Sequence, residues 1–212
     1  MEIPIELVKD LRQRTGAGVI DCKTALQEAK GDVDGAIEYL RRKGLSTAAK
    51  KAGRIATDGL VSSYIHAGGK MGVLVEINCE TDFVAKTEDF QTFVKNIAMH
   101  IAAASPQYIR REEIPEEVLE RERAIYRTQA QDSGKPQKVI DKIVEGKMER
   151  FYSEVCLLEQ TYVRDSDLTI KELLDAMIAK VGENITIRRF VRFQLGEGLS
   201  SQSSTTASSS VK

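Results

Sequence analysis

The spacing of apolar residues changes twice along the chain, and this change constrains the fold more than any other feature. Residues 1–54 follow the helical period, residues 60–79 alternate with a period of two, and the helical period returns from Asp89. Helices and strands bury their apolar residues at these different intervals, so the chain must contain both in separate segments. The sequence therefore predicts an α+β fold in which an antiparallel sheet packs against flanking helices.

Residues 1–54 are predicted to form an N-terminal module of three short helices. Its apolar side chains recur at helical spacing in three groups, namely Leu7, Val8 and Leu11, then Cys22, Ala25 and Leu26, then Val33, Ala36, Ile37 and Leu40. Asp32 is placed to cap the third helix and Gly44 to end it. Residues 45–56 carry alanines and basic residues without a wide apolar stripe, and we interpret them as an exposed helical linker.

Residues 55–198 are predicted to form the core domain, which begins with a β-hairpin. Leu60–His66 and Met71–Cys79 alternate in polarity and are joined by a turn that contains two glycines. The helix expected from Asp89 has the cleanest apolar stripe of the sequence, formed by Phe90, Phe93, Val94, Ile97, Ala98 and Ile101. We expect this helix to cover the sheet.

Two charged segments in the middle of the core domain predict a helical hairpin at about residues 116–156. The segments 116–131 and 136–156 have helical periodicity and are separated by a short Gly-Pro break, which favours an antiparallel arm. The Ser/Thr-rich residues 199–212 contain too little apolar material to offset the entropy of ordering, so this tail is expected to be disordered.

The end of the core domain is predicted to return to the sheet. Thr169 and Glu172 have the spacing of a capping box ahead of an apolar helical segment. Residues Ile185–Leu195 then alternate in polarity, which indicates a final strand.

The charge balance argues against nucleic acid or a membrane as a direct partner. The 212 residues are 30% charged with a net charge of −1, so no global basic field exists. We interpret the basic residues as solvated surface groups rather than as a nucleic-acid site; they are Lys50, Lys51, Arg54, Arg188, Arg189 and Arg192. No apolar run approaches the roughly 20 residues that span a bilayer, and the start lacks the pattern of a signal peptide. We expect a cytoplasmic protein.

No spacing typical of enzyme chemistry occurs in the sequence. A phosphate-binding glycine loop, a nucleophile elbow and a metal-ligand cluster are all missing, so no catalytic residue, metal ligand or cofactor is predicted. His66 and Cys79 are the one pair considered as a Cys/His site, against the alternative that the cysteine only packs. His100 is expected to be a helix-face residue. The three cysteines, Cys22, Cys79 and Cys156, are expected to be reduced and mostly buried.

Several motifs follow one another along the chain. Residues 8–18 with Asp21, Cys22 and Lys23 form the first, and residues 78–85 contain the segment Thr-Asp-Phe-Val. Residues 98–103, 133–136 and 144–148 form the others. These motifs resemble those of the elongation factor Ts family, in the order in which that family carries them, with Thr-Asp-Phe-Val as its hallmark. The resemblance covers about residues 3–198. It implies that the N-terminal module is similar to ubiquitin-associated domains.

The resemblance also implies a function without reactive groups. It identifies a nucleotide-exchange factor that binds elongation factor Tu with GDP, displaces Mg²⁺ and GDP, and allows GTP to bind. Phe83 is implied as a wedge beside the partner's Mg²⁺ and phosphate site, with Thr81, Asp82 and Val84 around it. A second contact is implied on the N-terminal module, through Arg12, Val19 and Ile20.

Only one hairpin-and-helix core fits between residues 57 and 111, whereas the long bacterial members of the family carry two. This indicates the short form, in which a second chain supplies the other copy, and a homodimer is expected.

A ubiquitin-type or peptide-binding adaptor remains the alternative from another functional class, because a fold does not by itself specify a function.

Overall fold

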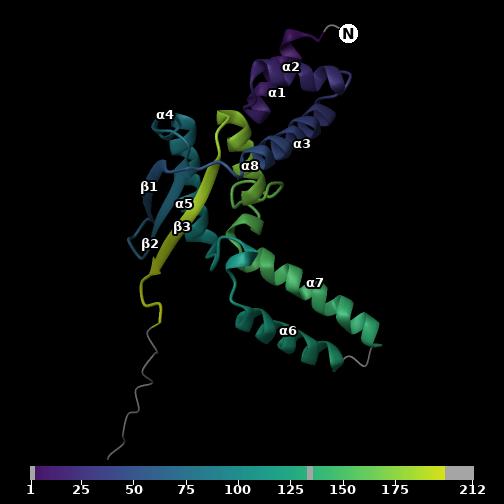
Figure 1. The fold of residues 1–212 in the computed structure, drawn as a ribbon, viewed down its shortest axis with the longest axis vertical. Helices are drawn as coiled ribbons and strands as arrows, with labels where there is room; N and C mark the ends of the chain where they lie inside the picture. The colour runs from purple at the N-terminus through teal and green to yellow at the C-terminus, as the bar shows by residue number, and fades with distance from the viewer. Residues whose placement is uncertain (1–2, 133–135, 199–212) are drawn as a thin grey trace, which may run out of the picture.

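The computed structural model describes residues 3–132 and 136–198, and it has the predicted α+β composition (Figure 1). Its elements are, in order, α1 (Ile5–Thr15), α2 (Val19–Glu28), α3 (Val33–Lys51), β1 (Asp58–Ile65), β2 (Met71–Cys79), α4 (Asp82–Ala85), α5 (Glu88–Ala104), η1 (Arg111–Glu113), α6 (Glu116–Gln131), α7 (Gln137–Val155), η2 (Leu157–Glu159), α8 (Ile170–Val181) and β3 (Ile185–Gln194). The predicted disordered tail and residues 133–135 of the predicted break lie outside the described residues.

The three strands form one antiparallel sheet in the order β1-β2-β3. The predicted hairpin joins β1 to β2, and β3 returns to the free edge of β2 after the intervening helices. Alternate residues of β2 face inward, because Val73, Val75 and Ile77 are buried while Leu74 is 47% exposed. The sheet therefore has one covered face and one open face, as the alternating pattern predicts.

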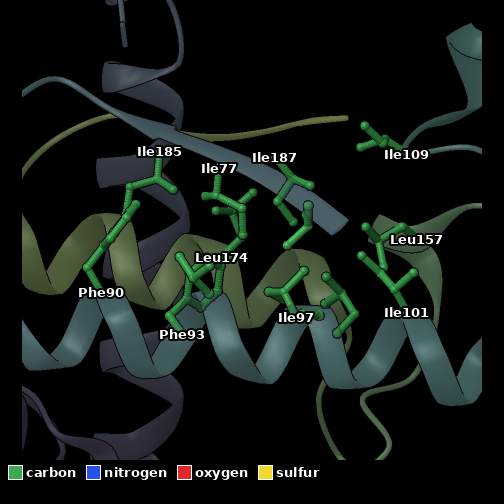
Figure 2. Close-up of a cluster of buried hydrophobic side chains, with 14 of the residues drawn as sticks. Ile77, Phe90, Phe93, Ile97, Ile101, Ile109, Leu157, Leu174, Ile185 and Ile187 are labelled. Atoms are coloured by element: carbon green, nitrogen blue, oxygen red, sulfur yellow. The ribbon is translucent and has the colours of Figure 1, made fainter. Parts of the chain in front are cut away.

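The main hydrophobic core lies between the covered face of the sheet and two helices (Figure 2). Helix α5 presents its predicted stripe to the strands, and α8 contributes Leu174 beside it. Thr87 caps α5 by accepting a hydrogen bond from the Phe90 N–H, and Thr169 and Glu172 form the predicted capping box at α8. The helix predicted to cover the sheet is confirmed in that position.

The N-terminal module contains the three predicted helices around its own cluster, which includes Leu11, Cys22 and Leu26. Asp32 caps α3 as predicted, accepting a hydrogen bond from the Gly35 N–H at 2.9 Å. The prediction that Gly44 ends this helix is wrong, because α3 continues to Lys51.

Packing against α8 explains this extension of α3. Gly44 is buried, and a Cβ on it would lie 3.7 Å from the Ala179 Cβ. Ala48 is 4% exposed and belongs to the main core, while Arg41 forms a salt bridge with Glu172. Small residues allow the two helices to approach closely, and this burial outweighs the weak helix propensity of one glycine. The interpretation of residues 45–56 as an exposed linker is therefore wrong for the face that contacts α8.

The two charged segments form the predicted hairpin of α6 and α7, which projects from the body of the molecule in Figure 1. A separate cluster holds the two helices together, with Leu119, Ile140, Val144 and Met148 buried. At its base, Arg111 forms salt bridges with Glu149 of α7 and with Glu159. The hairpin thus has its own apolar seam and an ionic attachment to the core.

Candidate partner-binding site

The Thr-Asp-Phe-Val segment forms the turn between β2 and α5, and it places one large apolar side chain in solvent. Thr81 caps the single-turn helix α4, since its hydroxyl accepts a hydrogen bond from the Val84 N–H at 3.4 Å. Val84 and Ala85 are buried in the main core, whereas Phe83 is 79% exposed. The buried residues Val84 and Ala85 anchor the turn in the core, while the side chain of Phe83 lies in solvent.

A break between two helices explains why Phe83 is exposed. It precedes Phe90 by seven residues, so a continuous helix would put both on one apolar stripe. Instead α4 ends at Ala85, and Thr87 starts a new helix while its hydroxyl donates to the Val84 carbonyl at 2.8 Å. The break turns Phe83 away from the stripe and fixes α4 to α5.

The charged residues of the turn pair with each other at the surface. Asp82 forms a salt bridge with Lys86 at 2.5 Å, and this hydrogen bond is the main cause that lowers the pKa of Asp82. Both side chains are exposed, so the pair adds little stability and remains available to a partner.

The residues predicted on the N-terminal module also lie at the surface. Arg12 is exposed on α1, beside the buried Leu11. Val19 and Ile20 form the start of α2 and are 50% and 81% exposed. In Figure 1, α2 and α4 both lie in the upper half of the molecule, away from the α6–α7 hairpin.

The candidate Cys/His site is not formed. His66 follows β1 and its N–H bonds the Met71 carbonyl, whereas Cys79 pairs with Asp58 at the opposite end of the hairpin. Seven residue pairs along the strands separate them, on the order of 20 Å. Burial raises the pKa of Cys79 to about 11 and that of Cys156 to about 11, so both thiols stay protonated at neutral pH.

His100 lies on α5, and the face of this helix that carries it is fully buried. Its Nε2 lies 3.0 Å from the Gln160 Oε1, and its Nδ1 accepts a hydrogen bond from the Val163 N–H. Both ring nitrogens have protein partners, so we assign this histidine a structural role in the core. In the described part of the chain, no group of three or more His, Cys, Asp or Glu residues is arranged to hold a metal ion.

Several of the basic residues noted in the sequence have acidic or carbonyl partners. Arg188 and Arg189 both bind Glu76 at 2.6 Å, and Arg54 approaches Glu80 at 3.5 Å. Lys51 donates to the Gly182 carbonyl. Among the described helices, none has the length and apolar composition needed to cross a membrane.

One contact of the turn was not predicted from the sequence. Glu183, in the loop between α8 and β3, binds Thr81 through both carboxylate oxygens. The two residues are 102 positions apart, and no local motif links them.

Comparison with known proteins agrees with the motif resemblance. The family model described as elongation factor TS matches residues 46–197. Elongation factor Ts of Carboxydothermus hydrogenoformans is 64% identical over 197 residues, which are 93% of this chain and 91% of that protein. Elongation factor Ts of Geotalea uraniireducens is 61% identical, over 96% of this chain and 94% of the relative. The corresponding protein of Thermoanaerobacter pseudethanolicus is 62% identical, over 95% and 98%. These relatives are close to this chain in length.

Proposed function

Because the chain belongs to the elongation factor Ts family, whose members act as nucleotide-exchange factors in translation elongation, we propose that it binds elongation factor Tu with GDP and releases the nucleotide. In this mechanism it displaces Mg²⁺ and GDP, and GTP then binds. The protein supplies contact surfaces and no catalytic groups. The observation that carries the proposal is the 79% exposure of Phe83 on an anchored turn.

Phe83 acts as a wedge in the GTPase domain of the partner. Transfer of a phenylalanine side chain from water into a protein interior contributes roughly 1.5–3 kcal/mol. This energy favours a distorted partner in which the Mg²⁺ and phosphate sites are disturbed. Since coupling between two ligands is reciprocal, GDP weakens the binding of the exchange factor as much as the factor weakens the binding of GDP.

The two neighbours of Phe83 have different roles. Asp82 is exposed and offers a carboxylate to polar groups of the partner. Val84 is 9% exposed, so it anchors the turn in the core instead of making a broad contact with the partner. Thr81 caps α4 and sets the direction in which Phe83 leaves the surface.

The N-terminal module provides the second contact. Val19 and Ile20 form an exposed apolar pair at the start of α2, and we propose that this pair is the apolar part of a docking patch. Arg12 adds a charged side chain that can bind an acidic or carbonyl group. We also propose that this module is similar to ubiquitin-associated domains.

A homodimer follows from the open face of the sheet. This face, which we call the outer sheet face, carries exposed apolar residues from all three strands: Val61, Ile65, Leu74, Val191 and Phe193. Gly72 pairs with both Ile65 and Phe193 and adds no side chain between them. A second copy of the same face is a matching apolar surface, and it would cover the side of the sheet that α5 and α8 leave open.

The proposed setting is the cytoplasm, with elongation factor Tu as the protein partner and with neither nucleic acid nor a membrane as a direct ligand. Stopped-flow release of a fluorescent GDP analogue from purified elongation factor Tu tests the proposal. We expect release to accelerate in proportion to the concentration of this protein. Binding without acceleration would instead support an adaptor, and no binding would contradict both functions.

A further inference from the structure

The loop Gly182–Asn184, between α8 and β3, lies against the turn that carries Phe83. Glu183 is partly buried there and accepts two hydrogen bonds from Thr81. The Thr81 N–H donates to Oε2 at 3.0 Å, and the Thr81 hydroxyl donates to Oε1 at 2.7 Å. One carboxylate therefore binds the residue that caps α4 through both its backbone and its side chain.

The carboxylate orients the capping hydroxyl. A threonine hydroxyl has one hydrogen to donate, and Thr81 directs it to Glu183. The oxygen lone pairs then point toward the Val84 N–H, which lies 3.4 Å away. A glutamine in place of Glu183 would retain one acceptor oxygen and present a donor at the other position. It would therefore lose or misorient one of the two bonds.

The loop is itself held on both sides, so Glu183 extends from a fixed backbone. The Asn184 N–H donates to Glu80 Oε1 at 2.6 Å, and its side-chain amide donates to the Arg54 carbonyl at 2.7 Å. Lys51, at the end of α3, donates to the Gly182 carbonyl. These bonds join the loop to the end of β2 and to the segment that leads from the N-terminal module.

A helix as short as α4 depends on such support. It has only four residues, and a single turn has little stability of its own because its first N–H groups lack helical partners. Phe83 gains little packing inside the protein, since 79% of it is exposed. Its position is thus set by the cap at Thr81 and by the two buried residues that follow.

We infer that Glu183 is a positioning residue for the Phe83 contact and acts by holding Thr81 in its capping geometry. The inference rests on the proposed exchange function. A wedge that is already ordered loses less conformational entropy on binding, so Glu183 increases the rate of exchange without touching the partner or the nucleotide.

Glu183→Gln tests the inference in the full-length protein. We expect a five- to tenfold loss in stimulated GDP release, measured as the second-order rate constant with elongation factor Tu. Amide hydrogen exchange should accelerate at Val84 and Ala85, without any partner present.

Glu172→Gln is the matched control, because Glu172 accepts a cap hydrogen bond at the opposite end of α8. It should change stability and leave stimulated release unchanged. An equal loss in both variants, or unchanged amide exchange at α4 in Glu183→Gln, would overturn the inference.

A double-mutant cycle of Glu183→Gln with Phe83→Ala tests whether Glu183 acts on exchange through Phe83. In a Phe83→Ala background, Glu183→Gln should cause no further loss of exchange, because the side chain that it positions has been removed. A further loss of similar size would show that Glu183 acts elsewhere and would overturn the inference alone. If Phe83→Ala itself leaves exchange unchanged, the proposed wedge fails, and the positioning role fails with it.

Discussion

At the scale of single residues, two phenylalanines seven positions apart have opposite environments. Phe83 is 79% exposed, whereas Phe90 is fully buried. Phe83→Ala should therefore leave the melting temperature within about 2 °C of the wild type, as expected for a surface substitution. Stimulated GDP release should fall by at least about tenfold, the equivalent of roughly 1.4 kcal/mol.

Phe90→Ala is the matched control for this prediction. It opens a cavity in the core and should cost about 3–5 kcal/mol of folding free energy. Melting and exchange kinetics are to be measured on the same preparations. A Phe83→Ala protein that melts as early as Phe90→Ala would show that Phe83 supports the core and is not a free wedge.

The buried ring of His100 should make the free energy of unfolding depend on pH. Burial lowers its pKa, so the folded protein keeps the ring neutral at pH values where the unfolded chain binds a proton, below about 6.5. The stabilisation is fully present above about pH 6.5 and decreases as the pH falls toward the lowered pKa of the folded state. Within this window the slope can reach about 1.4 kcal/mol per pH unit.

Urea unfolding at pH 7.5 and pH 5.5 measures this effect. The wild type should lose more stability on acidification than His100→Gln, which has no titrating ring. The paired carboxylate of Glu76 titrates at lower pH, because Arg188 and Arg189 lower its pKa from an ordinary value of 4.5, so it does not mask the histidine. Equal losses in both proteins would contradict the prediction.

At the scale of secondary-structure elements, the contact between α3 and α8 can be tested at Gly44. A glycine in a helix interior costs about 0.5–1 kcal/mol relative to alanine. An added Cβ would lie 3.7 Å from the Ala179 Cβ, which is an ordinary contact distance. Gly44→Ala should therefore raise the melting temperature by about 2–4 °C.

Gly35→Ala, in the same helix, is the control for this element. Its Cβ would lie 2.8 Å from the Asp32 carboxylate oxygen that caps α3, so the propensity gain should be offset by a disturbed cap. If Gly44→Ala lowers the melting temperature instead, α3 and α8 approach each other more closely than the structure shows.

At the scale of the whole molecule, the outer sheet face predicts self-association. Phe193 is 70% exposed near the end of the edge strand β3, where it pairs with Gly72 and lies on the same face as Leu74 and Val191. Phe193→Glu would place a charge there, and the desolvation of that charge should shift the protein toward monomer. Sedimentation velocity at micromolar concentration measures this directly, with the wild type expected as a dimer.

Ile125→Glu provides the comparison, because Ile125 is an exposed apolar residue on α6, away from the sheet. This variant should remain dimeric. A wild type that sediments only as a monomer, with an ordered core, would contradict the homodimer, and dissociation of both variants would show that the outer sheet face is not its specific site.

Most of the elements and their order could be predicted from local patterns in the sequence. The hairpin strands, the α5 stripe, the two arm helices and the Thr169 capping box depend on interactions between residues a few positions apart, which periodicity and capping patterns report directly. The exposure of Phe83 was implied by the family resemblance of the hallmark segment and by its place in a turn ahead of the α5 stripe.

Which elements touch and which polar groups meet depends on the packing of distant segments and could not be predicted from the sequence. Helix α3 continues past Gly44 because α8 packs against it, and the pKa of His100 is lowered because the core buries its ring. Glu183 binds Thr81 across 102 residues of sequence. Such contacts depend on how distant segments pack, and a local pattern carries no information about a partner that folding brings from elsewhere in the chain.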